Sequence, residues 1–142
     1  MAEASKAIMK CLDKIYQAEM SGISRYLHYS FMIMGHNRIP IQKWFRDNAT
    51  ESMTHAITIG EKITALGGHP SMTVPQVAET KSHSVNDLLI EVLAFEKNTA
   101  ALYKELVSLA GDDIAIEELA RGMVMLETEH IEEVSKMLRT TK

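Results

Sequence analysis

Cysteine, proline, long apolar runs and an excess of positive charge are all scarce or missing in this sequence. The single cysteine, Cys11, cannot form an intramolecular disulfide. No run is long enough to span a bilayer and no apolar signal core opens the chain, so we expect a cytoplasmic protein without a membrane partner. Fifteen Lys and Arg against 19 Asp and Glu give a net charge of -4, which argues against nucleic acid as a partner. Only three prolines favour helices over a turn-rich β architecture.

Apolar residues spaced by threes and fours fill most of the chain and predict four long helices. The first runs from about Ala4 to Met34 and ends at Gly35, the second runs from Pro40 to Gly67-Gly68, the third follows a cap at Ser84, and the fourth follows Gly111-Asp112-Asp113. A length of 142 residues suits one domain over 1–142. The sequence therefore predicts an all-α fold in a single domain.

The connections between these segments predict how the helices are arranged. Two of them are short, and one of roughly sixteen residues, near 68–83, contains Pro70 and Pro75. Short connections join antiparallel neighbours, whereas a long one allows the chain to cross along the bundle. We therefore expect an antiparallel four-helix bundle made of two helix pairs joined by one long crossover connection.

Ionisable residues interrupt the apolar stripe of every predicted helix near its middle. Glu127 and His130 are three residues apart, so both point to one face of the fourth helix. Glu19, His55 and Glu96 occupy the inward stripes of the other three helices. Any one of these glutamates alone would more often be exposed, and either histidine alone would more often be a hydrogen-bonded core residue. Their shared depth favours a metal site, with Glu127 bridging two cations.

The ligand types restrict the metal, because carboxylates and imidazoles without thiolates suit iron or manganese better than a structural zinc. The two halves of the chain also resemble each other. Tyr26 follows Glu19 by seven residues, and Tyr103 follows Glu96 by seven. We expect both tyrosines to be core aromatics whose hydroxyl groups also support the metal ligands. The remaining histidines show no paired spacing and are expected on the surface or in loops: His28, His36, His69 and His83.

These motifs resemble those of the bacterioferritins and other members of the ferritin-like di-iron superfamily. The resemblance covers nearly the whole chain and rests on Glu19 with Tyr26, Ser52-Met53-Thr54-His55, Leu66-Gly67-Gly68-His69-Pro70, Glu96, and Glu127 with His130. It implies a ferritin-like bundle that oxidises Fe(II) with dioxygen or peroxide at a di-iron centre and stores ferric iron in a homo-oligomeric cage. The five metal-site residues would then be the catalytic residues of a ferroxidase.

Two departures from the family pattern bear on function. Ser52 stands where the family has a bridging glutamate, three residues before His55. Glu51 is one position earlier and about 100° round the helix, so we expect a solvent or interface position for it more than a place among the metal ligands. On that expectation, Ser52→Glu should raise the rate of Fe(II) oxidation. Only twelve residues follow His130, so the family's short fifth helix is apparently absent.

Met53 occupies the position from which bacterioferritins offer a thioether to haem b across a subunit interface, and the resemblance makes haem a conditional prediction. Met53 is equally well explained as an apolar residue of a dimer interface. Two alternatives to iron storage also stay open. One is a small non-storage di-iron oxidase or peroxidase resembling the erythrin domain of rubrerythrins, and the other is a bundle whose metal site has degenerated through Ser52.

Overall fold

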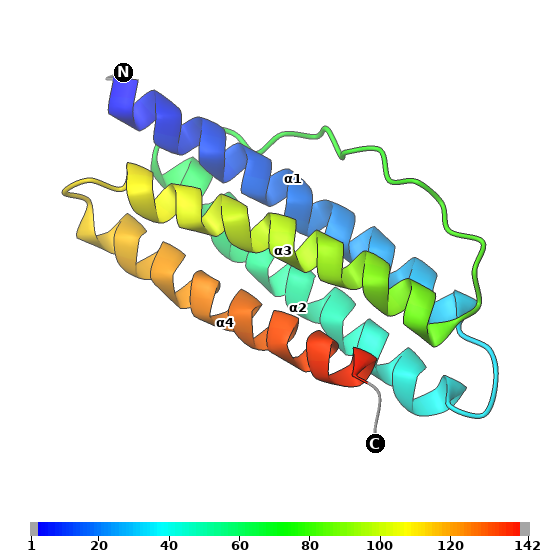
Figure 1. The fold of residues 1–142 in the computed structure, drawn as a ribbon. Coiled ribbons are helices and arrows are strands. Elements are labelled where there is room, and N and C mark those ends of the chain that lie inside the picture. Colours follow the sequence, from blue (N-terminus) through cyan, green and yellow to red (C-terminus); the bar gives the residue numbers. More distant parts are fainter. Residues whose placement is uncertain (1–2, 140–142) are drawn as a thin grey trace.

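The computed structural model describes residues 3–139, which form four helices and no strand (Figure 1). The helices are α1 (Glu3–Met32), α2 (Arg38–Ala65), α3 (Val85–Leu109) and α4 (Ile114–Leu138). The predicted four-helix bundle with one long crossover is confirmed, and the described residues contain no fifth helix. Within this range no helix is both long and apolar enough to cross a membrane.

The helix ends follow from local chemistry. Ser84 accepts a hydrogen bond from the backbone N–H of Asp87 and so caps α3, as predicted, and Asp113 caps α4 by accepting from Ile116 N. Gly35, with φ +102°, turns the chain between α1 and α2. The second helix begins two residues before the predicted Pro40, because a proline in the first turn removes an N–H that has no intrahelical acceptor.

Three of the four sides of the bundle are closed by direct helix packing. α1 packs along α2, α3 packs along α4, and α1 meets α3. The backbones of α2 and α4 do not approach within 8 Å of each other, measured between Cα atoms of the described residues. Side chains must therefore span the wider side of the bundle, between α2 and α4, which is called the open side.

Two apolar clusters fill the interior, one toward each end of the bundle. The first contains Ile8, Cys11, Leu12, Ile15, Ile59, Ile63, Tyr103, Leu106, Ala110, Ile116, Ala120 and Met123. The second contains Tyr26, Tyr29, Ile33, Phe45, Ala49, Leu88, Leu89, Val92, Phe95 and Val134. Buried ionisable residues from all four helices lie between the two clusters, so the apolar packing on either side fixes their depth.

The crossover connection between α2 and α3 runs beside α1 and is held to it by histidines (Figure 1). His28 Nε2 lies 3.2 Å from the Thr80 carbonyl oxygen, and His83 Nδ1 lies 2.7 Å from the Met32 carbonyl oxygen. The sequence predicts surface or loop positions for both histidines. His83 is exposed in the connection, but His28 is half-buried, because the connection covers this part of α1.

Candidate metal centre

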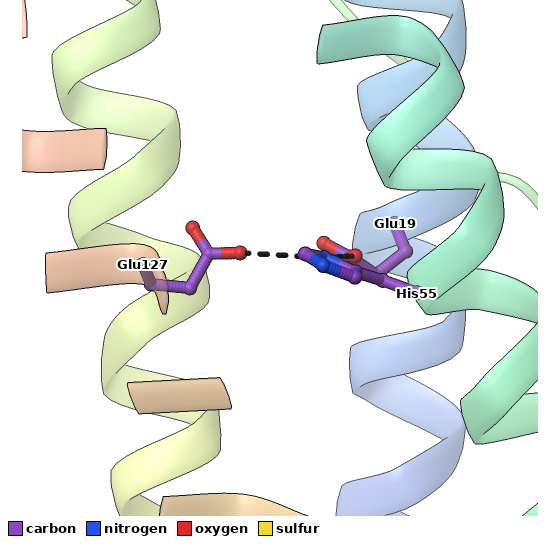
Figure 2. Close-up of side chains that lie close together, drawn as sticks. All are labelled: Glu19, His55 and Glu127. Carbon is purple, nitrogen blue, oxygen red and sulfur yellow. Dashed lines mark ion pairs between the residues drawn. The ribbon is translucent and has the colours of Figure 1, made fainter. Parts of the chain in front are cut away.

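The buried carboxylates and imidazoles in the middle of the bundle form a polar cluster. Its first half is built from α1 and α2. Glu19 and His55 are both buried, and Glu19 Oε2 lies 2.8 Å from His55 Nδ1. Glu127 approaches the same nitrogen from α4, with Oε1 3.7 Å away (Figure 2). One imidazole nitrogen therefore faces two carboxylates from two different helices.

The second half is built from α3 and α4. Glu96 is buried, and its Oε1 lies 3.8 Å from His130 Nδ1. Tyr26 donates a hydrogen bond from its hydroxyl group to Glu96 Oε1. The sequence repeat pairs Tyr26 with Glu19 on its own helix, whereas in the structure the hydroxyl group reaches across to α3, since residues two turns apart on one helix are separated by about 10 Å.

The carboxylate and imidazole groups form two sets, each able to hold one cation. Glu19, His55 and Glu127 make one set, and Glu96, Glu127 and His130 make the other. Within each set the ligand atoms lie within 4.8 Å of one another. All five residues that the sequence predicts are thus brought together, and Glu127 is common to both sets, as a residue that bridges two cations must be.

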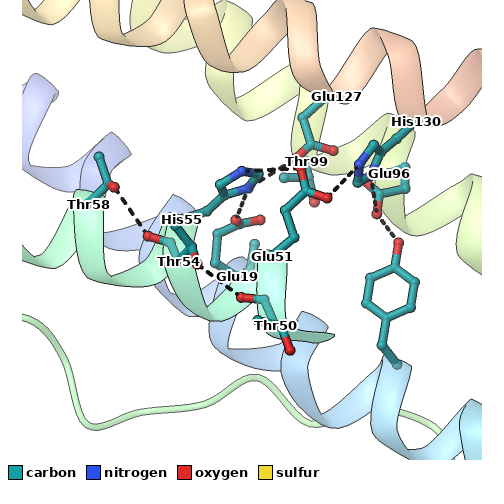
Figure 3. A network of polar contacts seen from close by, with 12 residues as sticks. Glu19, Thr50, Glu51, Thr54, His55, Thr58, Glu96, Thr99, Glu127 and His130 are labelled. Carbon is teal, nitrogen blue, oxygen red and sulfur yellow. Dashed lines mark hydrogen bonds and ion pairs between the residues drawn. The ribbon is translucent and has the colours of Figure 1, made fainter. Parts of the chain in front are cut away.

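Glu51 lies at the cluster, contrary to the solvent or interface position that the sequence favoured. Its Oε2 lies 2.9 Å from His130 Nε2 and its Oε1 lies 3.6 Å from His55 Nε2 (Figure 3). Its side chain is 35% exposed, so it closes the cluster on the open side between α2 and α4. α2 continues without a bulge through this region, so the long glutamate side chain itself covers the offset of one residue.

Ser52, which replaces the family's glutamate, is buried against α1. A Cβ built on Gly22 would lie 2.8 Å from Ser52 Oγ, so the serine occupies the space that the glycine leaves free. A larger side chain at position 52 has little room between the two helices. With Glu51 already on the histidines, the premise for a faster Ser52→Glu variant no longer holds.

Burial and neighbouring groups raise the pKa of some carboxyl groups in the cluster and lower that of another. Burial raises the pKa of Glu19, and burial together with the hydrogen bond and negative charge of Glu96 raises the pKa of Glu127. Burial also acts on Glu96, but hydrogen bonds from His130, Glu127 and Tyr26 outweigh it and lower the pKa of this carboxyl. Of these three carboxyl groups, Glu127 therefore favours its neutral form, and Glu96 keeps its negative charge most readily.

The two histidines favour the charged form. The hydrogen bond that Glu51 accepts from His130, followed by the one that Glu96 accepts, raises the pKa of His130 to about 10, and the contact with His130 lowers the pKa of Glu51. Burial works against charge on His55, yet the hydrogen bond and negative charge of Glu19 raise its pKa overall. The neighbouring carboxylates therefore stabilise positive charge on both imidazole rings.

This charge pattern fits two divalent cations. Divalent cations would replace protons that the cluster holds without them, such as those on Glu127 and His130, and so would return positive charge to the same space. Glu127 Oε2 is buried and has no hydrogen-bond partner among the described residues. A buried carboxylate oxygen without a donor is costly, and a bridging metal would satisfy it.

Of the other predicted residues, Tyr103 is buried and Met53 lies on the surface. The Tyr103 hydroxyl group is buried without a hydrogen-bond partner in the described part of the chain, and burial with the nearby negative charge of Glu19 raises its pKa. Met53 is 48% exposed on the outside of α2, away from the buried ligands. It cannot contribute to either set of potential metal ligands, and its thioether remains available to a group outside the bundle.

The sequence of the chain matches the model of a known protein family. A family model described as a ferritin-like domain matches residues 9–142. No curated protein matches the chain in sequence.

Solved structures resemble the chain over nearly its whole length. A ferritin-like diiron-carboxylate protein from Bacillus anthracis strain Ames is 25% identical, with a TM-score of 0.89 over 98% of this chain and 100% of that one. The bacterioferritin of Rhodobacter capsulatus, described with a metal-free dinuclear site and a heme iron, is 20% identical, with a TM-score of 0.81 over 92% and 82%. A dodecameric thioferritin from Bacteroides fragilis is 20% identical, with a TM-score of 0.82 over 94% and 85%.

Proposed function

The chain belongs to the ferritin-like domain family, and from that premise we propose that it binds two Fe(II) ions between its helices, oxidises them and stores the ferric product. The observation that carries this proposal is that two sets of potential ligands share Glu127. Dioxygen or peroxide accepts two electrons, one from each Fe(II), so two adjacent positions filled together suit the reaction. The activity proposed is that of a ferroxidase.

The protein's own residues have distinct tasks in this proposal. Glu19 and His55 hold one cation, Glu96 and His130 hold the other, and Glu127 joins the two. Tyr26 fixes the orientation of Glu96 through its hydroxyl group. The apolar clusters on both sides exclude water along the bundle axis, so ions and oxidant reach the site between α2 and α4.

Storage requires many copies of the chain, so we propose a homo-oligomer, as reported for the Bacteroides fragilis thioferritin. The exposed outer face of α2, which carries Met53 and Ile57, is the surface we assign to contact with another copy. Haem b stays conditional on that contact, since the exposed Met53 thioether of one chain supplies one axial ligand and a second copy would supply the other.

An erythrin-type oxidase or peroxidase without storage is the alternative, and one observation favours it. His130 is 23% exposed and Glu51 is 35% exposed, so a small oxidant has access to the site in a single chain, with no cage around it. A degenerate metal site is less well supported, because two sets of potential ligands are complete without a carboxylate at position 52, and Glu51 contacts both site histidines.

The deciding experiment is to add increasing Fe(II) aerobically and to measure iron per chain together with native mass. Storage predicts a high-mass assembly that retains far more than the two ions of the site. An oxidase predicts about two ions per chain, matching the two ligand sets, and rapid consumption of peroxide. Retention of no iron would contradict both functions and support the degenerate bundle.

A further inference from the structure

Each of the two site histidines presents its two ring nitrogens to different partners. His55 Nδ1 faces inward, 2.8 Å from Glu19 Oε2 and 3.7 Å from Glu127 Oε1. His55 Nε2 faces the other way, 3.6 Å from Glu51 Oε1. The inner nitrogen thus faces the two carboxylates that share a potential ligand set with His55, and the outer nitrogen faces Glu51.

His130 repeats the arrangement on the other side of the gap. Its Nδ1 lies 3.8 Å from Glu96 Oε1, and its Nε2 lies 2.9 Å from Glu51 Oε2. The two oxygens of one carboxylate therefore contact the outer nitrogens of both histidines, one on α2 and one on α4 (Figure 3). Glu51 belongs to neither of the two ligand sets identified among the described residues.

We propose that Glu51 is a positioning residue: its carboxylate pairs with Nε2 of His130 and faces Nε2 of His55, and so leaves each Nδ1 free to bind metal. The inference rests on the proposed function, since it assumes that the cluster binds cations. A histidine that ligates a metal through one nitrogen commonly donates its other N–H to a carboxylate, which fixes the ring and its tautomer. Here the single carboxylate of Glu51 lies near the outer nitrogens of both rings.

The register of α2 explains why Glu51 takes this place. Ser52 faces Gly22 of α1, and Glu51, one residue earlier, lies on the open side toward α4. From there its carboxylate reaches the histidines from outside, while Glu127 lies on their inner side. A glutamate three residues before the histidine would instead start from the buried position of Ser52. The shift by one residue thus changes which nitrogen of the ring a carboxylate can contact.

The competing assignment is that Glu51 binds the cations directly as a second bridging carboxylate. Cobalt(II) is a suitable probe, because it is not oxidised readily and its visible absorption reports the number and geometry of its ligands. For a positioning residue, Glu51→Ala should weaken cobalt binding by roughly 10- to 100-fold while the spectrum per bound ion at saturation stays as in the wild type. A changed spectrum at saturation would show a lost ligand and overturn the inference.

Two further variants sharpen the test. Glu51→Gln keeps a carbonyl oxygen that can accept one Nε2–H but loses the anionic carboxylate, so we expect affinity between those of the wild type and Glu51→Ala. Affinity as low as in Glu51→Ala would favour direct ligation. Glu61→Ala removes an exposed glutamate from the same helix and should leave cobalt binding unchanged. Circular dichroism checks that each variant is folded.

The outcomes separate this inference from the proposed function. If the wild type binds no cobalt, the metal site itself is refuted, and the role of Glu51 falls with it. If the wild type binds about two ions per chain, matching the two ligand sets, and only the Glu51→Ala spectrum changes, the metal site stands and the positioning role is wrong.

Discussion

Glu127 is the residue that the two potential cation sites have in common. It is shared by both ligand sets, and its Oε2 has no hydrogen-bond partner among the described residues. We predict that Glu127→Ala abolishes tight Fe(II) binding and leaves a folded bundle, because removing a buried carboxyl relieves a desolvation cost when metal is absent. Anaerobic Fe(II) titration and circular dichroism measure the two effects.

Glu118→Ala is the matched control, since Glu118 is an exposed glutamate on the same helix. It should bind as much iron as the wild type. Equal iron binding by Glu127→Ala and Glu118→Ala would count decisively against the assignment of Glu127.

Protonation of the cluster makes the metal-free protein sensitive to alkaline pH. The pKa of His130 is about 10 in the folded chain against about 6.5 when unfolded, so its stabilising contribution is complete below about pH 6.5 and is lost as pH rises toward 10. The raised pKa of Glu127 acts in the same direction, because the unfolded chain ionises this carboxyl near neutral pH more readily than the folded chain does. We therefore predict that the free energy of unfolding of the metal-free protein falls between these pH values.

Urea unfolding across that pH range measures the effect. Zinc-loaded protein should not show the same decline, since ligands bound to metal have already lost their protons. His130→Gln should reduce the decline, whereas His36→Gln, at an exposed position between α1 and α2, should keep it. A metal-free protein whose stability rises with pH over this range would contradict the prediction.

The depth of the site residues could be predicted from sequence, but their contacts could not. Helical periodicity shows that Glu19 and Glu127 point inward, because i and i+3 or i+4 share a face. It says nothing of the side-chain torsions that carry Glu51 across to His130, nor of the hydroxyl group of Tyr26 reaching α3. Those contacts depend on the distance between neighbouring helices, which a pattern within one helix does not contain.

Side chains of α2 and α3 pack closely against α1 at Gly22. A Cβ at this position would lie 2.8 Å from Ser52 Oγ and 2.9 Å from Phe95 Cζ. Alanine favours a helix over glycine by about 1 kcal/mol, whereas overpacking a core costs about 1–3 kcal/mol. We predict that Gly22→Ala lowers the free energy of unfolding, as measured by urea denaturation, because the steric cost exceeds the gain in helix propensity.

Gly122 provides the matched comparison. It lies at an exposed position within α4, and a Cβ there would meet no atom within 4 Å. Gly122→Ala should therefore stabilise the protein by about 1 kcal/mol, the propensity gain alone. If both alanine variants were equally stabilised, the helices would not be packed as closely at Gly22 as the structure indicates.

The number and order of the helices could be predicted because each apolar stripe continues over many turns and the breaks contain glycine or proline. The residues at which the helices begin and end could be predicted less accurately. α1 stops at Met32, two residues short of the predicted Met34, and α2 starts at Arg38. Ile33 continues the buried apolar stripe past the last helical residue, so hydrophobic spacing alone does not mark where backbone hydrogen bonding ends.

Assembly depends on surfaces that a single chain leaves exposed. Between Asp47 and Glu61 the exposed residues of α2 carry no charge, and Met53 and Ile57 are 48% and 58% exposed there. Depletion of charged residues together with exposed apolar side chains is typical of the core of a protein interface. This stretch of α2 is therefore where we expect a second copy of the chain to pack.

Ile57→Asp should accordingly reduce the native mass, because a carboxylate buried between two copies would lack a partner and oppose association. The wild type is expected as a multiple of the 15.9 kDa chain, and the variant as a smaller species that still binds iron within its own bundle. Ile90→Asp is the matched control, since Ile90 is 57% exposed on α3, and it should keep the wild-type mass. Native mass spectrometry decides the point: a monomeric wild type, or equal dissociation by both variants, would show that the face of α2 does not hold the assembly together.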